Sequence, residues 1–100
     1  MIDLTPDELS LVQKILRAQL PAAKVWVFGS RAKNTARRGS DLDLAIDAGA
    51  PLPLAVSARL ADAFDEAPLA CDVDLVDLHS ITPEFRALIE AHKIALPGFD

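Results

Sequence analysis

Three short runs of mostly apolar residues recur along the chain, at residues 24–28, 41–47 and 71–78. Runs of this length predict buried strands. Segments with apolar residues at helical spacing lie between them, so strands and helices alternate. This alternation predicts an α/β domain, a small mixed β-sheet flanked by helices. We expect helices over residues 6–19, 52–66 and 83–92, a short helical turn over 30–36, and an edge strand or a tail over 93–96.

The first two helices have the clearest sequence signals. Thr5 is a suitable N-cap, Pro6 fits the first helical position, and Glu8 completes a capping box. Pro21 ends this helix. In the second helix, apolar residues at helical spacing predict the buried face: Leu54, Val56, Leu60, Ala61 and Phe64.

Length and composition limit the class of protein. A chain of 100 residues, 51% of them hydrophobic, is expected to form one domain over residues 1–100. Its net charge of −5 argues against binding to duplex nucleic acid, which needs a broad basic face. The acidic N-terminal segment is unlike a signal peptide, and no apolar run approaches the ~20 residues of a membrane span. The single cysteine, Cys71, is typical of a reducing compartment. We therefore expect a cytoplasmic protein that does not bind membranes.

Positive charge is concentrated in one segment of this acidic chain. Four of the ten Lys and Arg residues lie within eight positions: Arg31, Lys33, Arg37 and Arg38. A basic segment of this size suits a small polyphosphate better than a long nucleic acid. The last three of these residues could neutralise a triphosphate, contact an acidic partner or simply belong to a solvated loop, and the solvated loop weighs as much as the other two roles together.

Asp41 and Asp43 lie two residues apart on a predicted strand. Side chains alternate between the faces of a strand, so both carboxylates are expected on one face. Two carboxylates this close raise each other's pKa unless a cation lies between them. Mg²⁺ would relieve the repulsion, because it prefers a few carboxylates together with the oxygens of substrate phosphates. The alternative is a solvated strand face, which an isolated Asp-x-Asp pattern indicates more often than a metal site.

The turn after the first strand favours the metal site. Gly29 allows the backbone to come close to a ligand. Ser30 offers a hydroxyl and a backbone N–H at the start of a helical turn, where anions are favoured. This turn and the Asp-x-Asp pair lie about ten residues apart, so both could hold one Mg²⁺-triphosphate.

A third carboxylate would complete a two-metal site. The third strand offers three candidates: Asp72, Asp74 and Asp77. We choose Asp74, because it lies in the middle of the strand, where an acid without a function would be costly to bury. Asp72 is the main alternative, and a solvated position at a strand end is the simpler interpretation of Asp72 and Asp77.

The segment "GSRAKNTARRGSDLDLAI", with "VDLV" downstream, resembles the minimal nucleotidyltransferases, the small members of the DNA polymerase beta-like nucleotidyltransferase superfamily. The shared pattern is a Gly-Ser turn, an Asp-x-Asp strand and a single Asp on a later strand, and it extends over about residues 25–76. The resemblance implies the DNA polymerase beta-like nucleotidyltransferase fold. It also implies Mg²⁺-dependent transfer of a nucleoside monophosphate, AMP from ATP, to a hydroxyl.

The same resemblance implies a role for each matching residue. Gly29 and Ser30 would hold the nucleoside triphosphate. Asp41 and Asp43 would ligate Mg²⁺, and Asp74 would complete the metal site and help to deprotonate the attacking hydroxyl. Arg31 belongs to the "GSRA" string and would steady either the helix or the phosphates.

Small members of this family resemble the antitoxins of toxin–antitoxin pairs, in which the nucleotidyltransferase modifies a tyrosine of a HEPN-domain toxin. The resemblance therefore implies a HEPN-domain partner and a hetero-oligomer. The chain contains no Tyr, so such a modification would fall on another protein. Two alternatives are a binding module that neutralises its partner without catalysis and an antibiotic-modifying adenylyltransferase. The second is disfavoured, because the chain has no room for a substrate domain.

Overall fold

The structure is a computed structural model that describes residues 2, 4–32 and 41–99. Its elements, in chain order, are α1 (Pro6–Gln19), β1 (Lys24–Phe28), the 3-10 helix η1 (Gly29–Arg31), β2 (Leu42–Asp47), α2 (Leu54–Glu66), β3 (Val73–Asp77), α3 (Pro83–Glu90) and β4 (Ile94–Ala95). The predicted strands and helices are all present, with ends that differ by up to two residues. Of the predicted turn over 30–36, the part up to residue 32 is described, and residues 33–40, with their basic side chains, lie outside the described range.

The four strands form one mixed sheet in the order β3-β2-β1-β4. β1 pairs antiparallel with β2 and with β4, whereas β2 and β3 run parallel and are connected through α2. The C-terminal segment therefore forms an edge strand rather than a tail. Next to this strand, the N–H of Leu96 donates to the carbonyl of Val25 at 2.9 Å. These findings confirm the predicted α/β class with a mixed sheet.

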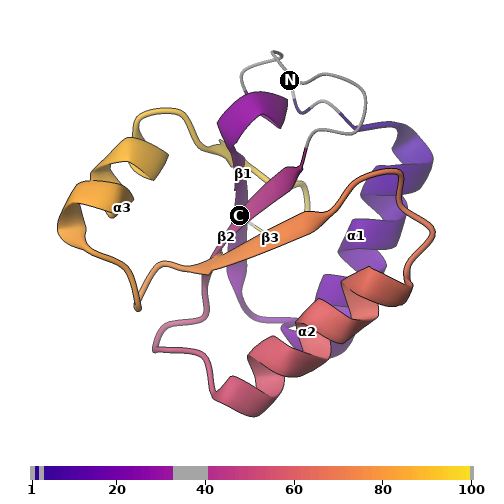
Figure 1. Cartoon of the computed structure of the whole chain (residues 1–100), viewed down its shortest axis with the longest axis horizontal. Coiled ribbons are helices and arrows are strands. Elements are labelled where there is room, and N and C mark those ends of the chain that lie inside the picture. Colours follow the sequence, from indigo (N-terminus) through magenta and orange to yellow (C-terminus); the bar gives the residue numbers. More distant parts are fainter. Residues whose placement is uncertain (1, 3, 33–40, 100) are drawn as a thin grey trace.

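Helices cover both faces of the sheet (Figure 1). α1 and α2 pack on one face, over the main hydrophobic core. Its fully buried members are Val12, Leu16, Val25, Val27, Leu42, Leu44, Ile46, Leu60 and Leu96. α3 packs on the other face, where Ile89 joins Ala45 and Leu78 in a smaller cluster. The smaller cluster leaves part of this second face available for polar side chains.

The predicted capping box of α1 is present. The Thr5 hydroxyl accepts a hydrogen bond from the N–H of Glu8 at 3.2 Å, and the Glu8 carboxylate accepts one from the N–H of Thr5 at 3.1 Å. Thr82 caps α3 in the same way, accepting from the N–H of Phe85 at 3.2 Å. No helix in the described part of the chain is both long enough and apolar enough to cross a membrane.

The predicted inner face of α2 is wrong at two positions. Leu60 and Phe64 are buried and Val56 is half-buried, but Ala61 is exposed and Leu54 is 85% exposed. A helix advances about 100° per residue, so Leu54 lies about 120° around the axis from Leu60. α2 therefore buries a narrower stripe than the sequence pattern predicts.

Replacing the two leucines of α2 tests this assignment. Leu60→Ala leaves a cavity in the main core and is expected to lower the free energy of unfolding by about 2–5 kcal/mol. Leu54→Ala, at the exposed position, should change it by less than about 0.5 kcal/mol. Urea unfolding of both variants measures the difference, and similar losses for the two would contradict the assigned face.

Candidate active site

Three strands place the predicted site residues at one end of the sheet. β1 ends there and leads directly into η1, and β2 and β3 both begin there. The register pairs Phe28 with Asp43 and Asp43 with Asp74. Paired residues of neighbouring strands lie about 5 Å apart at their Cα atoms. The start of the Gly29 turn, Asp43 and Asp74 therefore form one row across the sheet.

Asp43 and Asp74 form the centre of this row. Asp43 is half-buried on the face that α3 covers, and a side-chain hydrogen bond joins it to Asp74. Burial raises the pKa of the Asp43 carboxyl, and the charges of Asp74 and Asp41 and the hydrogen bond that protonated Asp43 donates to Asp74 raise it further. Without a cation, the charged form of Asp43 is thus disfavoured, because a buried carboxylate with other carboxylates beside it is destabilised.

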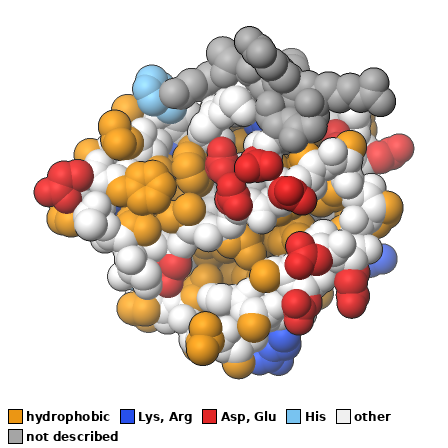
Figure 2. Space-filling view, viewed as in Figure 1, with side chains coloured by type: hydrophobic (Ala, Val, Ile, Leu, Met, Phe, Trp, Pro, Cys, Tyr) orange, Lys and Arg blue, Asp and Glu red, His pale blue; other side chains and the backbone are white. Residues whose placement is uncertain are grey.

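Asp41 lies just before β2 and is exposed. Its charge reaches Asp43, but among the described residues no three His, Cys, Asp or Glu side chains are grouped as a metal site. The structure thus pairs two of the three predicted carboxylates and leaves the third nearby. Acidic side chains gather near the centre of Figure 2, over this end of the sheet. Paired hard oxygens fit Mg²⁺, which takes its remaining ligands from phosphates and water.

Asp74 is exposed, so the expectation that it is buried is wrong, and burial does not distinguish it from Asp72. β3 is an edge strand, and the apolar cluster under α3 involves its later residue Val76. What distinguishes Asp74 is its register opposite Asp43. Asp72 lies before the strand with an exposed side chain, and its carbonyl accepts from the N–H of Leu42 at 2.9 Å.

Position 29 requires a glycine, because the Asp43 carboxylate lies beside it. Its φ is +71°, a left-handed conformation that other residues adopt at a cost. A Cβ at this position would collide with Oδ2 of Asp43 and lie 3.3 Å from its Cγ. The sequence suggested close approach to a ligand, but in this structure the neighbour is a side chain of the site. The turn and the carboxylate thus lie side by side, with no room for a larger residue at position 29 unless Asp43 moves.

Ser30 and Arg31 follow Gly29 in η1, with different surroundings. Ser30 is half-buried, whereas Arg31 is buried, with 8% of its surface exposed. Burial raises the pKa of the Cys71 thiol, and the positive charge of Arg31 opposes that rise. Because Arg31 is buried close to Cys71, its position favours steadying the turn over contacting phosphates.

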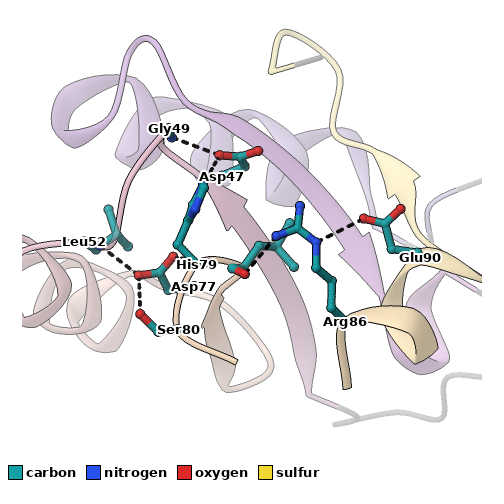
Figure 3. A network of polar contacts seen from close by, with 9 residues as sticks. Asp47, Gly49, Leu52, Asp77, His79, Ser80, Arg86 and Glu90 are labelled. Atoms are coloured by element: carbon teal, nitrogen blue, oxygen red, sulfur yellow. Dashed lines mark hydrogen bonds and ion pairs between the residues drawn. The ribbon is translucent and has the colours of Figure 1, made fainter. Parts of the chain in front are cut away.

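A second polar cluster lies at the opposite end of β2 and β3, where both strands end (Figure 3). Asp77 accepts hydrogen bonds from the N–H of Leu52 at 2.8 Å, the N–H of His79 at 2.9 Å and the hydroxyl of Ser80 at 3.0 Å. Burial raises the pKa of Asp77, but these hydrogen bonds outweigh it and the pKa is lowered. Asp77 therefore holds two loops together, which corrects its interpretation as a solvated strand-end charge.

His79 pairs with Asp47 in the same cluster, an interaction that sequence reasoning missed. Its Nε2 lies 2.6 Å from Oδ1 of Asp47, which also accepts from the N–H of Gly49 at 2.9 Å. These two hydrogen bonds lower the pKa of the Asp47 carboxyl. The local donors to Asp77 follow an Asx-turn pattern readable from sequence, but no spacing rule connects residues 47 and 79.

Known proteins resemble this chain in sequence. The family described as "Polymerase beta, Nucleotidyltransferase" matches residues 11–97. A "Probable protein adenylyltransferase MntA" of Haemophilus influenzae is 42% identical over 88 residues, which cover 88% of this chain and 77% of that protein. A "Protein adenylyltransferase MntA" of Shewanella oneidensis is 40% identical over 68 residues, and the match spans 67% of this chain and 48% of that protein.

Solved structures that are similar to this chain belong to proteins of the same kind. A crystal structure of a toxin–antitoxin with AMP-PNP has a TM-score of 0.76 and 31% identity, covering 88% of this chain and 71% of that chain. A crystal structure of the toxin–antitoxin MntA-HepT has a TM-score of 0.60 and 27% identity, covering 88% of this chain and 68% of that chain. The fold and the sequence thus lead to the same group of proteins.

The contact between Gly29 and Asp43 can be tested against a matched glycine. Gly49 also has a positive φ, +84°, but a Cβ there would meet nothing within 4 Å. Gly49→Ala should cost only the backbone strain, about 1–2 kcal/mol. Gly29→Ala should cost more, since it must also displace the Asp43 carboxylate. Chemical unfolding measures both variants, and equal losses would mean that the contact with Asp43 does not constrain the turn.

The Asp47 cluster predicts a pH dependence of stability. The folded-state pKa of Asp47 is lowered from its ordinary 3.8, so its contribution is fully present above that value and is lost as the pH falls through the folded pKa. Asp47→Asn should therefore be less stable than wild type near neutral pH, and the difference should shrink in acid, below about pH 4. Thermal unfolding across this range provides the measurement. The exposed Asp62→Asn on α2 serves as control, and a pH-independent difference for Asp47→Asn would contradict the prediction.

Proposed function

Because the chain belongs to the polymerase beta nucleotidyltransferase family, we propose that it transfers AMP from ATP to a hydroxyl group of a partner protein. The nucleotidyltransferase class follows from the family, and the names of its MntA relatives support ATP and a protein acceptor. The observation that carries the proposal is the carboxylate pair of Asp43 and Asp74 beside the Gly29 turn.

Asp43 and Asp74, with Asp41 close by, would hold Mg²⁺. The raised pKa of Asp43 supports this role, because a site in which burial and neighbouring carboxylates destabilise a negative charge is one that a cation stabilises. When bound, Mg²⁺ would stabilise negative charge on the phosphates of the substrate. The turn over residues 28–31 would orient the triphosphate, and Gly29 and Ser30 would lie nearest to it.

Asp74 would act on the acceptor. Its side chain is exposed while that of Asp43 is half-buried, so of the two it is the one that a partner's hydroxyl can reach. The hydroxyl oxygen attacks the α-phosphorus, the bond to the bridging oxygen of pyrophosphate breaks, and the hydroxyl proton passes to Asp74. The products are the adenylylated acceptor and pyrophosphate.

The acceptor that we propose is a tyrosine of a HEPN-domain toxin, which the chain would bind as its antitoxin in a hetero-oligomer. Two observations support this: similar solved structures include toxin–antitoxin proteins, one of them named MntA-HepT, and the chain itself contains no Tyr. We also propose that residues 1–100 act as one nucleotidyltransferase domain in the cytoplasm, which the free thiol of Cys71 supports.

Asp74→Asn separates an enzyme from a binding module. The change keeps the shape of the side chain but removes the base and the charge, and positioned acid–base groups contribute about 10²–10⁴-fold to a rate. We expect AMP transfer to the co-purified partner to fall by at least about 100-fold, measured by mass spectrometry of the partner with ATP and Mg²⁺. Stability without Mg²⁺ should not fall, because one member of a repelling pair is neutralised.

Asp72→Asn is the matched control, since Asp72 is an exposed Asp two residues away. It should retain transfer, and loss of transfer here with retention in Asp74→Asn would assign the third carboxylate to Asp72. If wild type neutralises the partner fully without transferring any AMP, the chain is a binding module and the enzymatic proposal fails.

A further inference from the structure

A pocket of about 270 Å³ opens between η1 and α3, next to the Gly29 turn. It is lined by Phe28, Gly29, Phe85, Leu88, Ile89 and His92. In Figure 2 a hydrophobic patch covers the region of α3 and borders the central group of acidic side chains. This pocket therefore adjoins the candidate active site but has a different chemistry.

The walls of the pocket combine aromatic rings with exposed aliphatic surface. Phe28 and Phe85 pack edge to face, with ring centroids 6.4 Å apart and ring planes at 79°. Ile89 is buried, whereas Leu88 is 70% exposed and Phe85 is 39% exposed. When a flat ligand covers apolar side chains that border a pocket and contact water, the free energy falls, because apolar surface is removed from water.

The pocket and the carboxylates are within the reach of one nucleotide. Gly29 lines the pocket and also lies beside the Asp43 carboxylate. Phe28 lines the pocket and is the register partner of Asp43, about 5 Å away across the strands. A ligand with its phosphates at the Gly29 turn and the carboxylates can thus extend its base, one sugar away, toward α3.

We propose that this pocket binds the base of the nucleoside triphosphate and selects purines over pyrimidines by the apolar area that they cover. The inference rests on the proposed function and specifies the substrate class of that site. Stacking of a base on an aromatic side chain does not depend on the identity of the base. Among the described residues that line the pocket, His92 alone has a polar side chain, so adenine and guanine should be distinguished weakly.

The affinities of four ligands test the proposal: ATP, GTP, CTP and inorganic tripolyphosphate, each with Mg²⁺, titrated calorimetrically. ATP and GTP should bind more tightly than tripolyphosphate, by roughly five- to 150-fold, the range that stacking of one base gives. CTP should fall between the purine nucleotides and tripolyphosphate, because its smaller ring covers less apolar surface.

Variants of α3 locate the effect. Leu88→Ala should weaken ATP about three- to tenfold and leave tripolyphosphate unchanged, since it shortens an apolar wall. Phe85→Leu, which keeps an apolar side chain against Phe28, should act in the same direction. Leu54→Ala is the matched control, because Leu54 is an 85% exposed leucine on α2, the helix that packs on the other face of the sheet.

Three results would overturn the proposal. If ATP and tripolyphosphate bind equally while AMP transfer proceeds, the base lies elsewhere and the proposed function stands. If Leu88→Ala and Phe85→Leu leave ATP affinity unchanged but reduce transfer, the pocket receives the acceptor side chain rather than the base. If neither ATP nor tripolyphosphate binds, the proposed function itself fails, and the pocket assignment fails with it.

Discussion

The register of β2 is the constraint on which the rest of the structure depends. Its alternate residues Leu42, Leu44 and Ile46 are fully buried, in the core beneath α1 and α2, and this turns Asp43 to the opposite face with Ala45. A shift of one residue would exchange these sets and bury Asp43 in the main core. The hydrophobic core thus decides where the carboxylate points. The pairing of β2 with β1 and β3 then places Asp43 between the Gly29 turn and Asp74.

Aspartates at the two ends of the same strands have opposite electrostatic states. At the beginning of β2 and β3, Asp43 is partly buried with acids for neighbours, and both raise its pKa. At the other end, backbone N–H groups, a hydroxyl and an imidazole surround Asp47 and Asp77, and both pKa values are lowered. A cation would stabilise the carboxylates at the first end, whereas hydrogen bonds within the protein already stabilise those at the second. This contrast explains why one acidic cluster is a candidate for chemistry and the other stabilises loops.

α3 links the sheet to the ligand that we propose. Ile89 packs it onto the sheet beside Ala45, and Phe85 contacts the ring of Phe28 at the end of β1. The exposed side chains of the same helix form one wall of the pocket beside Gly29. A short helix thereby completes the second core and provides apolar surface next to a charged site. Base and phosphates can be held on adjacent surfaces without a separate nucleotide-binding domain.

The sequence by itself determined the elements and their order, because helix caps, β-branched runs and apolar spacing depend on residues close together in the chain. Thr5, Glu8 and Pro21 set the limits of α1, and the pattern from Gly29 to Asp74 indicated the family through local motifs in a fixed order. The tertiary structure decided what depends on pairing between distant segments. It turned Leu54 outward, exposed Asp74 while setting it opposite Asp43, and filled the space beside Gly29 with a carboxylate. It also joined His79 to Asp47, 32 residues away in the chain. Such contacts follow from strand register and helix rotation, which the packing of the whole core determines and which no local pattern contains.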